Sequence, residues 1–369
     1  MTMTPDARGY DLAVVGAGIV GLAHAAAAVR RGLRVVVIER STAITGSSIR
    51  NFGHIGTGMH TGLAREYADR SRGIWLDLAE TAGFWCRDAG ALLVARADDE
   101  LAILEESGAG AVLTAAQVDA LVPVVGAVGG THSAPDLQVD PRDAAPAIAR
   151  YLEGIGVEFR WRTTALGVES GVVHTGRGDV RAECIVVATN FDVDQLYPEL
   201  AERYGVVRCA LDMLLTDGVG LGLPLLTGSS MLRYSAFAAT PSASAVRDRF
   251  AREDPELLAR DVNQMYTERP DGSLVVGDTH TRDIAVSPFQ EEESFDLLRR
   301  ITGTLFGREL RVRERWQGIY ASAPQDFLIE APADGVRVVA VTTGIGMTTG
   351  LGLGDSIVNE LFGNPGGTP

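Results

Sequence analysis

Alternating hydrophobic and polar segments at the start of the chain predict a strand, a glycine turn, a helix and a second strand. The first strand is the apolar run that ends at Val15, and the second is Val35 to Ile38. The alanine run after Gly21 favours a helix that packs closely against the sheet, and Gly32 ends that helix. Buried strands that alternate with helices are typical of a parallel sheet in an α/β fold.

Later segments extend this sheet and add a second architecture. Glu183 to Asn190 and Val338 to Val341 are further buried strands, and we expect a last helix to start after the glycine-rich run that ends at Asp355. Two insertions are expected to form a second lobe with an antiparallel sheet. Its expected segments are the strand Ala91 to Ala95, a charged helix, the helix Ala115 to Val122, the segments 212–215, 230–234, 263–267 and 273–280, and the helical stretch 247–261.

The predicted fold is α/β, with a Rossmann-type domain and an interleaved α+β domain that contains the antiparallel sheet. A chain of 369 residues exceeds the roughly 250 to 300 residues that one core usually supports, so two domains are expected. We assign residues 1–83, 141–205 and 316–369 to the Rossmann-type domain, and residues 84–140 and 206–315 to the interleaved domain.

Charge and cysteine content exclude several classes of partner. The net charge of −15 argues against nucleic acid and anionic membranes. Cys86, Cys184 and Cys209 have no CxxC spacing and no neighbouring histidines, which predicts structural cysteines without a metal site or disulfide framework. The first eleven residues lack the features of a secretory signal, and no apolar stretch reaches the roughly 18 residues that span a bilayer. We therefore expect a cytoplasmic protein with no integral membrane segment.

The turn after the first strand has the spacing of a dinucleotide-binding site. Gly16, Gly18 and Gly21 supply a tight turn, a close backbone approach to a pyrophosphate, and tight packing of helix on strand. The N-terminus of the helix then faces the phosphates. Glu39 closes the second strand, where a carboxylate accepts hydrogen bonds from ribose hydroxyls. NAD and FAD share this pattern, so the turn alone does not separate them.

The segment after Glu39 favours FAD. A simple NAD domain proceeds to another helix and strand, whereas residues 41–62 form a long loop of small and polar residues. Backbone N–H groups and the hydroxyls of Ser47 and Ser48 are placed to bind a pyrophosphate, and the glycines let the chain run beneath a flavin ring. The alternative is a flexible surface loop, which glycine and serine also favour.

Taken together, these segments resemble the D-amino acid oxidase and glycine oxidase superfamily of flavoproteins along nearly the whole chain. The matching pieces are Gly16-x-Gly18-x-x-Gly21 with Glu39-Arg40, the Gly46-Ser47-Ser48 loop, the strand 183–190, Trp316-Gln317-Gly318 with Pro324, and the C-terminal glycine run. The resemblance implies that the glycine run lies at the pyrimidine end of the flavin, where a helix dipole stabilises negative charge. The residues implied to contact FAD are Gly16, Gly18, Ile19, Val20, Gly21, Glu39, Arg40, Ser47, Ser48, Asn51, Phe52, Gly53, His54, Ala165, Ala188, Thr189, Asn190, Gly344, Ile345, Gly346, Met347, Thr348 and Thr349.

The same resemblance predicts that FAD is bound non-covalently. Members with covalent flavin use a histidine in the early loop or a cysteine near the C-terminus. Gly56 occupies the histidine position of the nearest Asn-x-Gly-x-x-His match, and there is no C-terminal cysteine. His54 and His60 are the other histidines near this loop.

Further motifs resemble a bacterial branch of the superfamily that is linked with aminophosphonate catabolism. They are Ser48-Ile49-Arg50-Asn51-Phe52-Gly53, Arg70-Ser71-Arg72-Gly73-Ile74-Trp75-Leu76, Val139-Asp140-Pro141-Arg142, Pro255-Glu256-Leu257 and Val276-Gly277-Asp278-Thr279-His280. The resemblance implies oxidation of a small anionic amine related to 2-aminoethylphosphonate. The chemistry is hydride transfer from carbon to flavin N5 and hydrolysis of the resulting imine, and it requires no dedicated base.

An anionic substrate needs a cation, and the arginine fork suits a carboxylate or a phosphonate. Arg233, expected on a strand beside Tyr234, is the first candidate, with an exposed or ion-paired arginine as the alternative. Arg50 is the second, and its alternative role is to brace the flavin loop. Asp278 is expected to hold a turn rather than to catalyse. The other candidates for the pocket wall, each of which has ordinary packing as its alternative, are His54, Tyr266, His280, Gln317 and Tyr320.

Two other functions remain compatible with the sequence. A 2-hydroxy acid oxidase or dehydrogenase would use the same flavin geometry, and a non-catalytic flavoprotein would bind FAD without being reduced by a substrate. Whether oxygen or another electron acceptor reoxidises the flavin depends on the shape of the cavity, which the sequence does not reveal.

Overall fold

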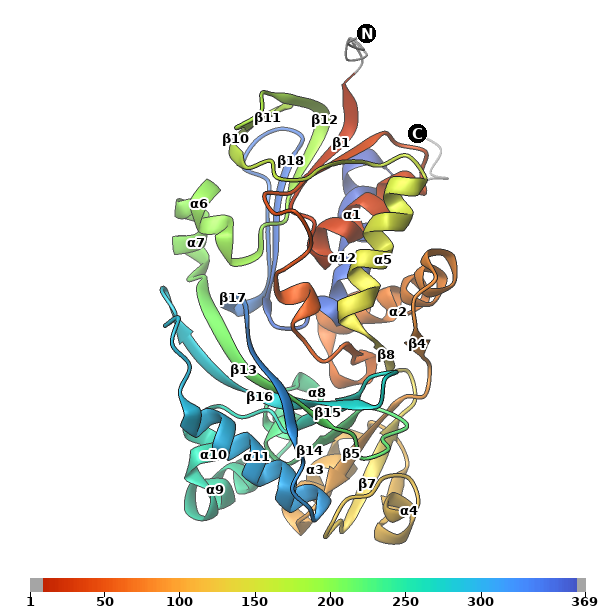
Figure 1. Ribbon diagram of the computed structural model, residues 1–369, viewed down its shortest axis with the longest axis vertical. Coiled ribbons are helices and arrows are strands. Elements are labelled where there is room, and N and C mark those ends of the chain that lie inside the picture. Colours follow the sequence, from red (N-terminus) through yellow and green to blue (C-terminus); the bar gives the residue numbers. More distant parts are fainter. Residues whose placement is uncertain (1–8, 364–369) are drawn as a thin grey trace.

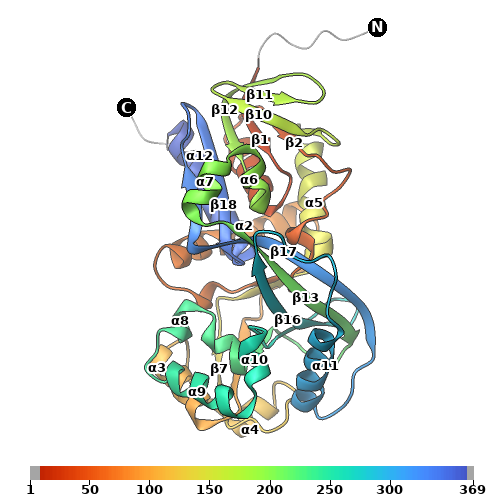
Figure 2. The ribbon, with the colours of Figure 1, turned by 90° about the vertical axis from the view of Figure 1, so that its left-hand side faces the viewer.

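The computed structural model describes residues 9–363 and shows two lobes stacked along the long axis of the molecule (Figure 1; Figure 2). One mixed sheet runs through both lobes. Its strand order is β6-β7-β5-β14-β15-β16-β13-β17-β18-β12-β1-β2-β9, and β10 and β11 form a hairpin beside β12. The mixed α/β architecture that the sequence predicts is confirmed.

The first lobe contains the parallel part of the sheet. Its strands are β1 (Tyr10–Val15), β2 (Val35–Ile38), β9 (Glu158–Arg160), β12 (Val180–Val187) and β18 (Val336–Thr343), with the hairpin β10 (Ala165–Glu169) and β11 (Val172–Thr175). The parallel strands follow the order β9-β2-β1-β12-β18, the arrangement typical of dinucleotide-binding folds. The long strand β17 (Val312–Glu330) pairs antiparallel with β18 and continues into the second lobe.

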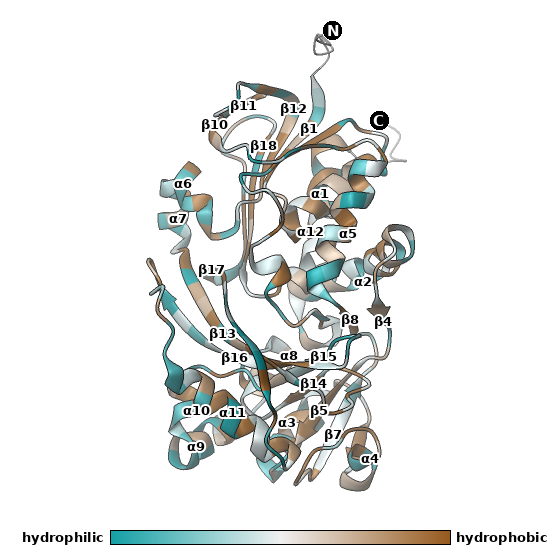
Figure 3. Ribbon diagram, viewed as in Figure 1, coloured by the Kyte–Doolittle hydropathy of each residue, from teal (hydrophilic) through white to brown (hydrophobic). Residues whose placement is uncertain are grey.

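Helices cover both faces of the parallel sheet, because alternate residues of each strand point to opposite faces. In β1, Leu12 and Val14 belong to one hydrophobic core, and Ala13 and Val15 belong to the other. The first core contains α1 (Ile19–Val29), α2 (Gly62–Ala82), α5 (Pro141–Gly154) and α12 (Gly346–Phe362), and the second contains α6 (Val193–Leu196) and α7 (Pro198–Tyr204). Figure 3 shows hydrophobic segments of α1 and of β12 on these inner faces.

The second lobe has its own core around the mainly antiparallel part of the sheet. Its strands are β5 (Ala91–Ala95), β6 (Val112–Thr114), β7 (Gly129–Ser133), β13 (Val207–Asp217), β14 (Leu225–Thr227), β15 (Met265–Glu268) and β16 (Ser273–Asp283). Its helices are α3 (Asp98–Ser107), α4 (Ala115–Asp119), α8 (Ser235–Ala238), α9 (Ala243–Glu253), α10 (Pro255–Ala259) and α11 (Glu292–Phe306). A small sheet consists of β3 (His54–Ile55), which belongs to the long segment between β2 and α2, β8 (Leu137–Val139) and β4 (Cys86–Arg87).

The C-terminal glycine run differs from its expected form. Instead of a loop to Asp355, the chain enters α12 at Gly346, so the run is helical. A Cβ atom on Gly352 would lie 2.2 Å from the Tyr67 carbonyl oxygen, and one on Gly354 would lie 2.7 Å from Ala23 Cβ. Close packing of α12 against α2 and α1 therefore outweighs the low helix propensity of glycine.

Three further local expectations are corrected. Arg233 does not lie on a strand, because the chain forms the 3-10 helix η4 (Gly228–Leu232) with Arg233 at its end. Asp278 does not hold a turn, because it lies inside β16, at the point where the register between β16 and β13 shifts. Asn190 lies beyond the end of β12, in the 3-10 helix η3 (Asn190–Asp192), with a positive φ of 59°.

Candidate active site

A cavity of about 620 Å³ opens at the carboxyl edge of the parallel strands and reaches into the second lobe. The ends of β1, β2 and β12 border it at Val15, Ile38 and Ala188. Ligands of open α/β folds bind outside the carboxyl ends of the strands, and the volume is in the range of cofactor and ligand pockets.

The glycine turn after β1 is built for close approach of the backbone. Gly16 has a φ of 105°, and a Cβ atom there would lie 2.5 Å from the Ala188 carbonyl oxygen. Gly21 packs the first turn of α1 against the same turn, since its Cβ atom would lie 1.9 Å from the Gly16 carbonyl oxygen. The tight turn and the close helix packing predicted from the sequence therefore have direct counterparts at Gly16 and Gly21.

Glu39 and Arg40 form the edge of the cavity at the end of β2. The Glu39 carboxylate accepts hydrogen bonds from the backbone N–H of Ala17 at 2.9 Å and of Ser41 at 2.8 Å. Because a carboxylate has about four acceptor positions, it retains capacity for ribose hydroxyls. Arg40 forms an ion pair of 2.5 Å with Asp192, which also lines the cavity.

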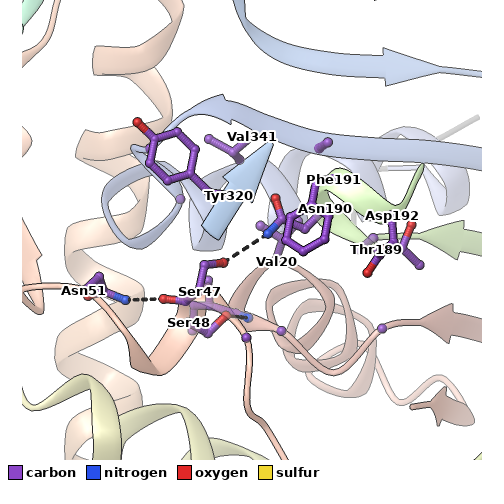
Figure 4. A pocket seen from close by; sticks show the side chains of 18 of the residues that line it. Val20, Ser47, Ser48, Asn51, Thr189, Asn190, Phe191, Asp192, Tyr320 and Val341 are labelled. Carbon is purple, nitrogen blue, oxygen red and sulfur yellow. Dashed lines mark hydrogen bonds between the residues drawn. The ribbon is translucent and has the colours of Figure 1, made fainter. Parts of the chain in front are cut away.

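The loop after β2 is tied to both neighbouring walls of the cavity. Ser48 Oγ accepts a hydrogen bond of 2.8 Å from the Ile19 N–H at the start of α1. Asn190 Nδ2 donates to Ser47 Oγ at 3.1 Å, and Asn51 Nδ2 donates to the Ser47 carbonyl at 2.8 Å, as Figure 4 shows. Asn190 Oδ1 also accepts from the Ala321 N–H of β17. The loop is therefore held in a defined position in which Ser47 and Ser48 line the cavity.

The start of α12 closes the cavity near the junction of the two lobes. Gly344, Ile345, Gly346 and Met347 line it. Trp75 Nε1 donates a hydrogen bond of 2.8 Å to the Met347 carbonyl and fixes this turn. A 17-residue helix directs the positive end of its dipole at the cavity, which suits the negative charge of a reduced flavin.

The second-lobe end of the cavity holds a charged cluster of Arg233, Asp261, His280 and Asp278. Arg233 forms an ion pair of 2.6 Å with Asp261 and donates from Nη2 to His280 Nε2 at 2.9 Å. Because an arginine only donates, Nε2 accepts, and Nδ1 of His280 carries the proton that it donates to the Asp261 carbonyl at 2.7 Å. Burial, with the Arg233 charge beside it, holds the pKa of His280 well below its usual range, so the ring is neutral.

Aromatic side chains enclose this end. Burial raises the pKa of Tyr234 to about 12 and holds that of Tyr320 well above its usual range, so both phenols keep their protons at neutral pH. His60 lies edge-on to the Tyr234 ring, and burial lowers its pKa to about 4. These three side chains are therefore neutral beside the Arg233 cluster, and the other charged side chains of the cavity wall are Glu39, Arg40, Arg50, Asp192 and Asp326.

Most of the residues expected from the sequence meet at this cavity. The expected cofactor contacts that line it are Gly16, Gly18, Ile19, Val20, Glu39, Arg40, Ser47, Ser48, Asn51, Phe52, Ala165, Ala188, Thr189, Asn190, Gly344, Ile345, Gly346 and Met347. The expected substrate contacts that line it are Arg50, Arg233, Tyr234, His280 and Tyr320.

Three expected substrate contacts lie elsewhere. Tyr266 is 1% exposed and packs edge-on against Phe306 in the core of the second lobe. The Gln317 side chain points to Asp212, while its backbone carbonyl accepts a hydrogen bond from Arg50. His54 bonds Asp136 through Nε2 at 2.8 Å, behind the wall of the cavity.

Four expected cofactor contacts act through packing rather than by lining the cavity. They are Gly21, Gly53, Thr348 and Thr349. Gly53 has a φ of 71° and lies against the Val139 carbonyl, and Thr348 Oγ1 accepts a hydrogen bond from the Gly56 N–H.

Asp278, Asn263 and Asp326 were not expected in the wall. Asp278 lies two residues before His280 in the sequence. Because residues i and i+2 of a strand share a face, this spacing could have placed Asp278 in the cavity wall beside His280.

Neither a metal centre nor a membrane span accompanies this site in the part of the chain that the structure describes. Within residues 9–363, no three histidine, cysteine, aspartate or glutamate side chains gather closely enough to hold a metal ion. The described helices include none with the length and apolar character needed to cross a bilayer.

Comparisons with known proteins agree with this geometry. Residues 11–360 match the family described as FAD dependent oxidoreductase. A D-amino acid dehydrogenase of Helicobacter pylori is 24% identical over 244 residues, which cover 48% of this chain and 59% of that protein. The match thus spans less than two thirds of the relative's length.

Solved structures show the same fold across nearly the whole chain. Glycine oxidase from Bacillus cereus ATCC 14579 has a TM-score of 0.78 and 17% identity, over 96% of this chain and 95% of that one. L-Proline dehydrogenase from P. horikoshii has a TM-score of 0.79 and 16% identity, over 96% of this chain and 94% of that one. With a dinucleotide cradle in place and a family match over residues 11–360, the chain belongs to the DAO family of FAD-dependent oxidoreductases and is an FAD-dependent enzyme.

Proposed function

We propose that this enzyme oxidises a small anionic amine at the carbon next to its nitrogen, and that the substrate is an aminophosphonate related to 2-aminoethylphosphonate. The observation that carries the proposal is the Arg233 guanidinium in the wall at the second-lobe end of the cavity. A guanidinium in a largely buried, aromatic-lined site suits a carboxylate or a phosphonate. The similar proteins named above, a D-amino acid dehydrogenase and a glycine oxidase, bear names of enzymes that act on amino compounds.

Different side chains of the cavity bind the substrate and the cofactor. When bound, FAD accepts a hydride from the substrate carbon, and the imine that forms is hydrolysed to an aldehyde or keto acid. Arg233 binds the anionic group of the substrate, and Tyr234 and Tyr320 enclose it and exclude water. The glycine turn, Glu39 and the loop at Ser47 hold the nucleotide part of the cofactor.

Anaerobic reduction of the bound flavin tests the proposal. We expect 2-aminoethylphosphonate or a close aminophosphonate to bleach the flavin absorbance at about 450 nm, a band set by the cofactor. Glycine, sarcosine, D-alanine and 2-hydroxy acids are the comparison compounds. Bleaching by an amino acid alone would support amine oxidation and contradict the proposed phosphonate substrate. Bleaching by a 2-hydroxy acid alone would contradict amine oxidation. Reoxidation in air or only by an added dye then tells an oxidase from a dehydrogenase.

We also expect the FAD to be released intact when the protein is denatured. The described residues of the cavity wall include no cysteine, and both ring nitrogens of His280 are engaged in hydrogen bonds. Denaturation in acid followed by centrifugation should leave the flavin in the supernatant and no flavin fluorescence on the protein band of a denaturing gel. Fluorescence that stays with the polypeptide would point to His60, the other histidine in the wall.

A further inference from the structure

Asp278 is a buried acid in the cavity wall; its Oδ2 atom lies 3.7 Å from His280 Nε2, and its Oδ1 atom has no hydrogen-bond partner. It lies on β16 and is 2% exposed. Its backbone is fixed by the pair of hydrogen bonds that it exchanges with Asn263. Its Oδ1 atom is buried and accepts no hydrogen bond of normal geometry, although the Asn263 amide is near enough to lower its pKa. A buried carboxyl oxygen without a partner is costly, so its presence in a binding cavity requires an explanation.

The groups that face Asp278 leave its charge available to a ligand. Arg233 and Arg282 share Asp261 at 2.6 and 2.7 Å, so these three side chains carry one net positive charge. With an ionised Asp278, the four side chains have no net charge. A zwitterionic ligand, which also has no net charge, leaves this sum unchanged. The other titratable groups that face it are Tyr234, Tyr320, Cys209 and His280, all of which are neutral.

The protonation of Asp278 changes in the working range of an enzyme. Burial raises its pKa to about 7, and Arg233 acts in the opposite direction. The neighbouring histidines do not compete as proton acceptors. His280 uses both ring nitrogens in hydrogen bonds, and His60, with a pKa of about 4, is a weak base.

We propose that Asp278 is the base that removes a proton from the ammonium group of the bound substrate, while Arg233 holds its anionic group. In this step one N–H bond of R–CH2–NH3+ breaks, its electron pair stays on nitrogen, and an O–H bond forms on the carboxylate. The products are the neutral amine and a protonated Asp278 that later returns its proton to water. Hydride transfer from the neutral amine itself needs no base, so Asp278 acts only in the step before it. This inference rests on the proposed function and deepens it, because it assigns the substrate class as zwitterionic amines.

Asp278→Asn is the test variant, and Asp212→Asn is its matched control. Asp212 is a buried carboxyl on the adjacent strand β13, and it bonds Thr279 and Gln317 outside the cavity. In the wild type we expect the rate of flavin reduction by 2-aminoethylphosphonate to fall about tenfold per pH unit below pH 7. In Asp278→Asn the rate at pH 8 falls about 100-fold, as for loss of a general base, and then rises with pH as the neutral amine becomes more abundant. Asp212→Asn keeps the wild-type profile.

Binding of anions that lack an amine gives a second readout, independent of turnover. Acetate and ethanesulfonate keep a single negative charge between pH 6 and 9, and flavin absorbance in the holoenzyme reports their binding. An anion binds better beside a protonated carboxyl than beside an ionised one. The affinity of the wild type for them should therefore fall up to about tenfold per pH unit above pH 7, whereas that of Asp278→Asn stays constant.

The outcomes separate this inference from the proposed function. If Asp278→Asn matches the wild type in both pH profiles, or if neither anion binds at pH 6, Asp278 is not the base, even where amines reduce the flavin. If only 2-hydroxy acids reduce the flavin, the proposed function fails. A pH-dependent affinity for the anions that Asp278→Asn abolishes would then still place a titrating carboxyl beside the anion.

Discussion

Replacing Gly21 with alanine should remove FAD from the purified protein. The added Cβ atom would lie 1.9 Å from the Gly16 carbonyl oxygen, so the turn or the start of α1 has to move by more than an ångström. Overpacking of this kind costs about 3 kcal/mol, and it acts on the N–H groups that face the pyrophosphate. Since about 1.4 kcal/mol is a factor of ten, we expect flavin affinity to fall about 100-fold. Titration of the apoprotein with FAD, followed by fluorescence, measures the change.

Gly73→Ala is the matched control for this substitution. Gly73 also lies in a helix, α2, but a Cβ atom there meets no atom within 4 Å. Alanine should stabilise that helix by up to about 1 kcal/mol and leave FAD binding unchanged. Equal flavin affinity in Gly21→Ala and Gly73→Ala would mean that the contact between α1 and the turn does not shape the phosphate site.

The nucleotide end of the site is predictable from the sequence because its determinants are local. Gly16 and Gly21 are five residues apart. Their spacing is set by short-range steric requirements that any strand-turn-helix of this kind must meet. Glu39 follows one strand later, at a distance along the chain that the βαβ unit sets. These positions need no knowledge of the remaining chain, and the structure brings them together.

The substrate end depends on pairing between distant strands, which the sequence does not specify. Tyr320 and Gln317 both lie on β17, but an odd separation of three places them on opposite faces of the strand. The pairing of β17 with β13 decides whether Tyr320 or Gln317 points into the cavity. The Gly277-Asp278 pair favours a turn, because aspartate commonly holds turns, whereas Asp278 lies inside β16 and its backbone exchanges hydrogen bonds with Asn263.

Tertiary packing also overrides propensity in the last helix. The glycines from Gly346 onward are poor helix formers, and the resemblance to flavoproteins predicts a loop up to Asp355. Their missing side chains let α12 approach α1 and α2, and the helix begins early enough to direct its N-terminus at the cavity. A glycine run followed by a helical pattern is therefore consistent with a loop or with a helix until the packing partners are known.

Replacing Arg233 with methionine should abolish recognition of the anionic group while leaving the fold intact. Methionine keeps the length of the aliphatic stem but removes the guanidinium from the cavity wall. Asp261 retains Arg282 at 2.7 Å, whereas Asp278 loses the positive charge that lowers its pKa, so KM is measured at a pH well above 7. Loss of a buried charged hydrogen bond to a ligand costs about 3 kcal/mol, which corresponds to an increase in KM of about 100-fold for 2-aminoethylphosphonate. Stopped-flow flavin reduction over a range of substrate concentrations measures it.

Arg282→Met provides the comparison that assigns this effect to the cavity. Both arginines bind Asp261, but only Arg233 lines the cavity, and the side chain of Arg282 is 40% exposed. A loss that reflects only the ion pair with Asp261 would appear in both variants, whereas loss of a substrate anchor appears in Arg233→Met alone. An unchanged KM for 2-aminoethylphosphonate in Arg233→Met would transfer the role of anchor to Arg50, the other arginine proposed from the sequence, which also lines the cavity.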